Sequence, residues 1–386
     1  MPEVLSPRAL LEKLVSFPTV SRDTNLPLID WVQDYLVSHG IDAQRHVKPD
    51  DAQKAAIFAH VGPQETGGVI LSGHTDVVPV DGQDWNFDPF VVTEQDGKLY
   101  GRGTTDMKGF DALAIWTLVE AQKRGVSRPL QLALSYDEEI GCTGAPPLIE
   151  AMQGLPRASD VIVGEPTMMK AVTGHKGGVN FWVHVHGFEV HSSLLHTGVS
   201  AIMWAAKMID WANQLNADLQ AAEPAGMAGL FDPPYTNVHV GMIHGGTAHN
   251  ISAKDCEFGL GYRVVPGESL DQWRRLTTDK MAELNAAMQE IRPGTGFELI
   301  EKFELPPFAP ENDNTAEALV RALTGDNSEN FVSYGTEASH FQQAGYKAVV
   351  CGPGSIHVAH QPDEYITLAQ FQQGHRFMEN LLERLS

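Results

Sequence analysis

Imidazole and carboxylate side chains end three short apolar runs of this 386-residue chain. One run ends in His74, the next is followed by the adjacent pair Glu138 and Glu139, and the third ends in Glu165. Each run is short and apolar enough to be a buried β-strand. Proteins with an open α/β sheet form their sites where the strand ends meet at one edge of the sheet. We therefore expect these side chains to lie close together.

The residue types indicate a transition-metal site. Imidazole and carboxylate ligands without thiolate suit zinc, and also cobalt or manganese, whereas oxygen ligands alone favour magnesium or calcium. Two ions about 3.5–4 Å apart need a carboxylate that contacts both. Asp106 is the best placed, in a Gly-rich turn before an apolar helix expected over 110–122. Asp76 can accept the second ring N–H of His74 and fix its tautomer.

The pair Glu138 and Glu139 is the most informative part of the set. A single carboxylate after a strand is commonly a helix cap or half of an ion pair. Two adjacent carboxylates beside the apolar run 130–134, however, repel each other unless a cation or a shared proton holds them. We therefore expect one of the two to bind metal and the other to be free for proton transfer.

The surrounding pattern predicts two domains, one inserted in the other. Alternating strand and helix signals run to about residue 176, which indicates an α/β fold with a mostly parallel sheet covered by helices. A different unit then follows, with the order βαββαβ: a strand from Val179, a helix over about 200–215, strands near 235–244 and 255–264, a helix over 269–291 and a strand near 297–303. This order predicts a ferredoxin-like lid.

The predicted boundaries make the catalytic domain discontinuous. Residues 1–177 form its first part, 178–304 the lid and dimerisation domain, and 305–386 its second part. His360, near the end of the chain, must therefore return beside His74. The segment 221–234 is rich in Gly, Ala and Pro and is expected to be a loop.

Composition excludes several classes of partner. The formal net charge of −22 argues against nucleic acid and against an anionic membrane surface, because both attract basic patches. Three widely spaced cysteines indicate a reducing, cytoplasmic environment without a disulfide framework. No run of 18 apolar residues occurs, and the N-terminus reads as an amphipathic helix starting near Ser6 rather than as a signal peptide.

Seven stretches of the chain resemble one known family, the dinuclear-zinc deacylases and exopeptidases that include aminoacylase, succinyl-diaminopimelate desuccinylase and acetylornithine deacetylase. The matching stretches run from end to end: SGHTDVVP (72–79), LYGRGTTDMKG (99–109), DEEIGCTGA (137–145), VGEPT (163–167), GFEVHSS (187–193), GGTAHN (245–250) and GPGSIHVAHQPDEY (352–365). The acetylornithine deacetylase group is the most similar.

The resemblance implies two Zn²⁺ ions per chain, which Co²⁺ can replace. It assigns the ligands as follows: His74 and Glu165 to one ion, Glu139 and His360 to the other, and Asp106 between them. It further implies that Glu138 is the general base and that Asp76 orients His74. By the same resemblance His191, in the lid, donates to the developing oxyanion from the partner subunit of a homodimer.

The resemblance also implies a function and a substrate pocket. The expected reaction is the removal of an N-acyl group from an amino acid, with N-acetylornithine, a precursor in arginine biosynthesis, as the first candidate. Asn250, Arg263 and the loop from Gly352 are candidates to bind the α-carboxylate of the substrate. A related deacylase or exopeptidase, such as a desuccinylase or an aminoacylase, is the alternative, and a metal-free binding homologue would require a degraded ligand set.

The remaining histidines are expected to be solvated or structurally hydrogen-bonded. His184 and His186, on the first lid strand, belong to this class. His357 competes with His360 as a ligand, but only His360 precedes the sequence QPDEY, as in the family. For His196, a turn residue and a functional residue remain equally compatible with the sequence.

Overall fold

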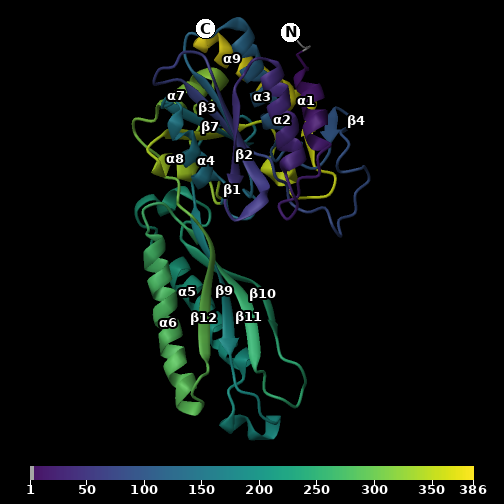
Figure 1. Ribbon diagram of the computed structural model, residues 1–386. Helices are drawn as coiled ribbons and strands as arrows, with labels where there is room; N and C mark the ends of the chain where they lie inside the picture. The colour runs from purple at the N-terminus through teal and green to yellow at the C-terminus, as the bar shows by residue number, and fades with distance from the viewer. Residues whose placement is uncertain (1–3) are drawn as a thin grey trace. The chain divides into compact units, whose positions relative to one another are not determined.

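The computed structural model describes residues 4–386, so the first three residues of the predicted catalytic domain lie outside the described part. The chain divides into two compact units (Figure 1). Unit 1 comprises Met1–Thr173, Pro310–Asn330 and Thr336–Ser386, and unit 2 comprises Gly174–Ala309 and Phe331–Gly335. Three short segments that the sequence pattern assigned to the catalytic domain therefore group with unit 2, namely 174–177, 305–309 and 331–335.

A mixed sheet in the order β1-β2-β6-β3-β7-β14-β8-β13 is the centre of the α/β fold. Its strands are β1 (Ala43–Lys48), β2 (Asp51–Val61), β3 (Val69–His74), β6 (Leu130–Ser135), β7 (Asp160–Pro166), β8 (Val172–His175), β13 (Asn330–Val332) and β14 (Lys347–Gly352). The four central strands, β6, β3, β7 and β14, are parallel to one another. Parallel strands buried on both faces read as continuous apolar runs, which is why the sequence marked them clearly.

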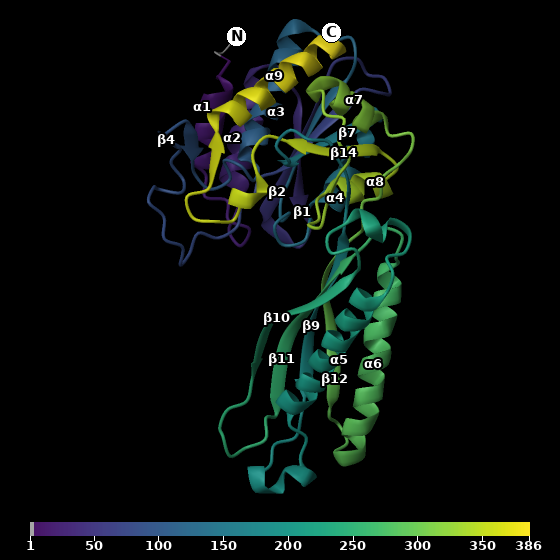
Figure 2. The ribbon, with the colours of Figure 1, turned by 180° about the vertical axis from the view of Figure 1, so that it is seen from behind.

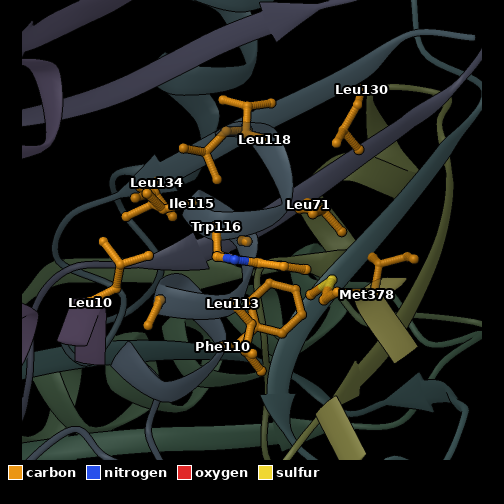
Figure 3. Close-up of a cluster of buried hydrophobic side chains, with 14 of the residues drawn as sticks. Leu10, Leu71, Phe110, Leu113, Ile115, Trp116, Leu118, Leu130, Leu134 and Met378 are labelled. Carbon is orange, nitrogen blue, oxygen red and sulfur yellow. The ribbon is translucent and has the colours of Figure 1, made fainter. Parts of the chain in front are cut away.

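One face of this sheet carries the main hydrophobic core. The helices that supply it are α1 (Pro7–Val15), α2 (Leu26–Ser38), α3 (Lys108–Arg124), α7 (Thr315–Thr324) and α9 (Leu368–Leu385). Figure 3 shows Phe110, Leu113 and Trp116 of α3 gathered with Leu71 of β3 and Met378 of α9. Helix α3 is buried through most of its length, so it does not show the one-sided apolar stripe of a surface helix.

Alternate strand residues point to the opposite face, where α4 (Ala145–Ala151) and α8 (Ala338–Gln343) lie. Ala133, Val161 and Val350 are buried there and are absent from the main core cluster. A separate three-stranded sheet has the order β15-β5-β4, made of β4 (Thr93–Gln95), β5 (Lys98–Tyr100) and β15 (Tyr365–Thr367). Residues near the end of the chain therefore pair with the segment that precedes Asp106.

Unit 2 is a four-stranded antiparallel sheet with helices on one face (Figure 2). Its elements follow the predicted order: β9 (Gly177–His186), α5 (Ala201–Ala221), β10 (Asn237–Gly245), β11 (Asp255–Val264), α6 (Leu270–Ile291) and β12 (Gly296–Leu305). The strand order β10-β11-β9-β12 is that of a ferredoxin-like fold. The predicted fold class, an α/β unit with an inserted βαββαβ unit, is therefore confirmed.

Helix boundaries follow local signals. Ser6 caps α1 by accepting a hydrogen bond from the backbone N–H of Ala9 at 3.2 Å, and Pro7 occupies the first turn. The segment 221–234, which is predicted to be a loop, contains a short 3₁₀ turn at Gly226–Leu230. Within residues 4–386, no helix combines the length and the hydropathy that a membrane span requires.

Candidate metal centre

The predicted ligands gather at the carboxyl ends of the parallel strands of unit 1. His74 is the last residue of β3, Glu138 and Glu139 lie in the turn after β6, and Glu165 is the next-to-last residue of β7. Asp106 is just before α3, whose N-terminus favours a carboxylate. These positions agree with the rule that open α/β sheets form sites at this edge.

Asp106 lies between the two histidines. Its Oδ1 is 3.2 Å from Nε2 of His74, and its Oδ2 is 3.1 Å from Nε2 of His360. His360 reaches this point from a loop after β14 and has a positive φ of 64°. A non-glycine residue is strained in that conformation, and such strain is typical of functional sites. One carboxylate thus faces both imidazoles, as a ligand between two ions must.

The other carboxylates divide between the two histidines. Glu139 Oε2 is 3.0 Å from Nε2 of His360. Glu165 Oε1 is 3.7 Å and Glu138 Oε2 is 4.0 Å from Nε2 of His74. Two groups of ligand atoms each lie within 4.8 Å of one another, close enough to share a cation: one is His74, Glu138 and Glu165, and the other is His74, Asp106 and Glu139.

The charge balance of this cluster fits a bound cation. Burial, and then the negative charge of Asp106, raise the pKa of Glu139 to about 8 and that of Glu165 well above its ordinary value. Oε1 of Glu139 and Oε1 of Glu165 are buried, and neither has a hydrogen-bond partner among residues 4–386. Hydrogen bonds to Asp106 and Glu139 raise the pKa of His360 to about 10. Carboxylates that are this crowded and this desolvated require a positive charge, which divalent ions supply.

Asp76 supports the site differently from the sequence expectation. Nδ1 of His74 bonds the backbone oxygen of Asp76 at 2.9 Å, whereas the Asp76 carboxylate is 3.6 Å away. That carboxylate instead accepts the backbone N–H groups of Glu138 at 3.1 Å and Glu139 at 3.4 Å, and the hydroxyl of Ser21 at 2.7 Å. Asp76 therefore fixes the imidazole through its main chain and the two glutamates through its side chain.

Glu364 is a supporting residue for which we made no prediction. Its Oε1 accepts the backbone N–H groups of Thr105 at 2.9 Å and Asp106 at 3.1 Å, and its Oε2 accepts Arg102 at 2.7 Å. All of these groups are buried. Because Glu364 lies four residues after His360, it ties the loop of one ligand to the turn of another. The sequence signal was its place in the matching stretch QPDEY.

Two further buried groups lie near Glu138. The thiol of Cys142 donates to Glu138 Oε1 at 3.2 Å. Glu337 contacts the hydroxyl of Ser135, and burial raises the pKa of Glu337 to about 8.

The predicted substrate residues lie in different places. His191 and Asn250 are exposed neighbours in unit 2, where the backbone N–H of Ser192 donates to the carbonyl of Asn250 at 2.9 Å. Nδ1 of His191 is 2.8 Å from the hydroxyl of Ser193. Arg263 is exposed on β11 of the same unit.

Gly352 lies in unit 1, where it is buried and its N–H donates to the hydroxyl of Thr167 at 3.2 Å. That donor is thus already engaged within the fold. His357 and His196 are exposed, and within residues 4–386 neither of them belongs to the cluster of ligand-type side chains.

Known sequences resemble this chain over nearly its whole length. The family model described as peptidase family M20/M25/M40 matches residues 70–384. Acetylornithine deacetylase of Myxococcus xanthus is 36% identical over 370 residues, which cover 93% of this chain and 92% of that protein. Acetylornithine deacetylase of Shigella sonnei (strain Ss046) is 34% identical over 365 residues, covering 92% and 91%.

Solved structures share the fold at lower identity. An M20 family metallo-carboxypeptidase from Sulfolobus solfataricus has a TM-score of 0.77 at 18% identity, with 99% of each chain covered. A tripeptidase from Staphylococcus aureus has a TM-score of 0.75 at 17% identity and the same coverage. A dinuclear metal binding peptidase of the M20 family from Bacillus subtilis has a TM-score of 0.65 at 15% identity, covering 98% of this chain and 97% of that one.

Proposed function

The chain belongs to peptidase family M20/M25/M40, and from this premise we propose that it is a zinc-dependent amide hydrolase that deacylates an N-acyl amino acid. The observation that carries the proposal is the cluster in which Asp106 faces both His74 and His360. Five ligand-type residues converge there, together with one extra glutamate that can transfer a proton.

N-acetylornithine is the proposed substrate, and ornithine and acetate are the products. The support is the name shared by two relatives that cover most of this chain at 34–36% identity. We place the reaction in arginine biosynthesis and the enzyme in the cytoplasm, in keeping with its three free cysteines. A related N-acyl amino acid, such as N-succinyl-diaminopimelate, is the second candidate.

Each residue of the proposed site has a distinct role. His74 and Glu165 would hold one ion, Glu139 and His360 the other, and Asp106 both. When bound, the two ions would act as Lewis acids and would make water acidic enough to ionise near neutral pH.

Glu138 would carry the proton through the reaction. Its carboxylate takes a proton from the attacking water, whose oxygen forms a bond to the acyl carbon. The C–N bond then breaks, and Glu138 returns the proton to the leaving amine. The Cys142 thiol and the backbone contact to Asp76 hold Glu138 in place for both transfers.

Residues of unit 2 would complete the site in a homodimer. His191 of the partner subunit would donate a hydrogen bond to the oxyanion as it forms. Arg263 and Asn250 would bind the α-carboxylate of the substrate. The net charge of −22 supports a small-molecule substrate rather than nucleic acid or an anionic membrane.

A substrate panel tests this proposal. The zinc-loaded protein is assayed with N-acetylornithine, N-succinyl-diaminopimelate, other N-acetyl amino acids and dipeptides, and kcat/KM is compared. The proposal expects the highest value for N-acetylornithine. A higher value for the succinyl substrate would assign a desuccinylase instead, and a higher value for dipeptides would assign an exopeptidase.

A further inference from the structure

The outer face of the unit 2 sheet carries two histidines side by side. Val183 and Val185 of β9 are fully buried in the unit 2 core, so the alternating residues His184 and His186 point to the other face. Their rings are 4.0 Å apart between centroids. The side chains are 31% and 43% exposed, so both are accessible to a solute.

Carboxylates from both neighbouring strands flank these rings. Strand β9 lies between β11 and β12 (Figure 1). Glu298 of β12 is paired directly with His184, and Asp255 of β11 with His186. The side chains contact diagonally: Nε2 of His184 is 3.3 Å from Asp255 Oδ1, and Nε2 of His186 is 3.2 Å from Glu298 Oε2. Diagonal neighbours on one face of a sheet are about 7–8 Å apart, which is still within reach of long side chains.

The ligand atoms of three of these residues are close enough to share an ion. One nitrogen of His184, one of His186 and one carboxylate oxygen of Glu298 all lie within 4.8 Å of one another. Bonds of about 2.0–2.2 Å to zinc place ligand atoms roughly 3–4 Å apart, so small side-chain rotations suffice. Glu257, also opposite His184, is already engaged by the indole N–H of Trp182 at 3.0 Å.

We propose that His184, His186 and Glu298 form a second, surface metal site that binds one transition-metal ion, with Asp255 as the adjacent carboxylate. Two imidazoles and a carboxylate select Zn²⁺, Cu²⁺ or Ni²⁺ over Mg²⁺. The ligands come from two neighbouring strands of unit 2, and the site uses no residue assigned to hydrolysis. The proposal is therefore independent of the substrate and of the catalytic ions.

Equilibrium dialysis against buffered free Zn²⁺, followed by metal analysis, tests the site. The variant with both His184→Gln and His186→Gln is compared with wild type at each free Zn²⁺ concentration. The expected result is one fewer ion per chain in the variant, with unchanged kcat and KM for amide hydrolysis. Glu298→Gln should weaken this additional binding by at least ~10-fold, as loss of even a supporting group costs that much.

His239→Gln is the matched control. His239 of β10 is also an exposed histidine of this sheet, but it lies at a different level along the strands. It is opposite Gly261 of β11, which in turn is opposite Asn180 of β9. Asn180 is four residues, or about 13 Å along β9, from His184. The control should bind as many ions as wild type.

Two results would overturn the site. One is equal Zn²⁺ binding by wild type and the double variant, and the other is an equal loss in the His239→Gln control. Circular dichroism of each variant confirms that the fold is kept.

Discussion

Glu138 and Glu139 are adjacent in sequence, but their side chains contact different groups. Replacing each one by glutamine should therefore show which is the proton acceptor and which is the metal ligand. Glu139 Oε2 contacts the His360 imidazole at 3.0 Å, whereas Glu138 Oε2 is 4.0 Å from His74, and its Oε1 accepts the Cys142 thiol. Glu138→Gln should therefore keep the metal and lose the proton acceptor. Glu139→Gln should lose a charged ligand and thus metal affinity.

The size of the first effect follows from proton transfer. Loss of a general base costs about 10²–10⁴-fold in rate. We expect kcat of Glu138→Gln to fall by at least ~10²-fold, which is about 2.7 kcal/mol in the barrier at ~1.36 kcal/mol per tenfold change. The fold should tolerate the change. Burial, and the charges of Asp106 and Asp76, raise the pKa of Glu138, so its charged form is already disfavoured.

The assay pairs metal analysis with steady-state kinetics on both variants after loading with Zn²⁺ under the same conditions. The expected pattern is a wild-type number of ions, two of them at the catalytic cluster, with a low kcat for Glu138→Gln, and fewer ions for Glu139→Gln. The reverse pattern would mean that Glu138 is the ligand and Glu139 the base. A kcat for Glu138→Gln within tenfold of wild type would refute the proton-transfer role altogether.

Four further predictions concern the metals, the dimer and two buried carboxylates. The purified protein should bind two zinc or cobalt ions at the catalytic cluster, and chelation should abolish hydrolysis; full activity with Mg²⁺ alone would contradict the ligand assignment. Mixing inactive Glu138→Ala and His191→Ala subunits after dissociation should restore about a quarter of wild-type activity. Half of the reassociated dimers are mixed, and each mixed dimer holds one complete site out of two. If no activity returned, His191 would act in the site of its own subunit. Glu364→Gln should weaken metal binding by about 10–100-fold in a chelator competition assay, because Glu364 holds the backbone of Asp106; an unchanged affinity would remove that role. Burial raises the pKa of Glu337 in the folded protein to about 8, above its ordinary 4.5, so the metal-free protein should lose stability as pH rises from about 4.5 to 8. In urea unfolding, the free energy of unfolding of Glu337→Gln should fall less over this pH range than that of wild type. If the two free energies fell equally with pH, Glu337 would not titrate there.

The strand ends that carry candidate ligands could be predicted because local pattern and chemistry agree at them. Strand ends such as His74 and Glu165 are visible in the sequence as apolar runs that stop at a polar residue. The fold class followed from the same alternation of strands and helices. Both depend on neighbours in the sequence.

Supporting contacts could not be predicted because they depend on segments far apart in the chain. Glu364 meets Asp106 from 258 residues away, and Glu337 meets Ser135 from 202 residues away. The orientation of the His74 ring brings its Nδ1 to the backbone oxygen of Asp76 rather than to the Asp76 carboxylate. The pairing of His184 with Glu298 likewise requires the register between β9 and β12.

The position of β14 between β7 and β8 has a consequence for synthesis on the ribosome. Strand β7 ends at residue 166, and its partner β14 begins at residue 347, about 180 residues later. At a synthesis rate of roughly 5–20 residues per second, the edge of β7 stays unpaired for on the order of 10–40 s before β14 is made. Most of unit 2 is continuous from 174 to 309, so it can fold during that interval, while unit 1 stays open and exposes an apolar strand edge. Chaperones that shield such edges should therefore affect the yield of unit 1 more than that of unit 2, and His360 joins its site only after most of unit 2 and β14 have been synthesised.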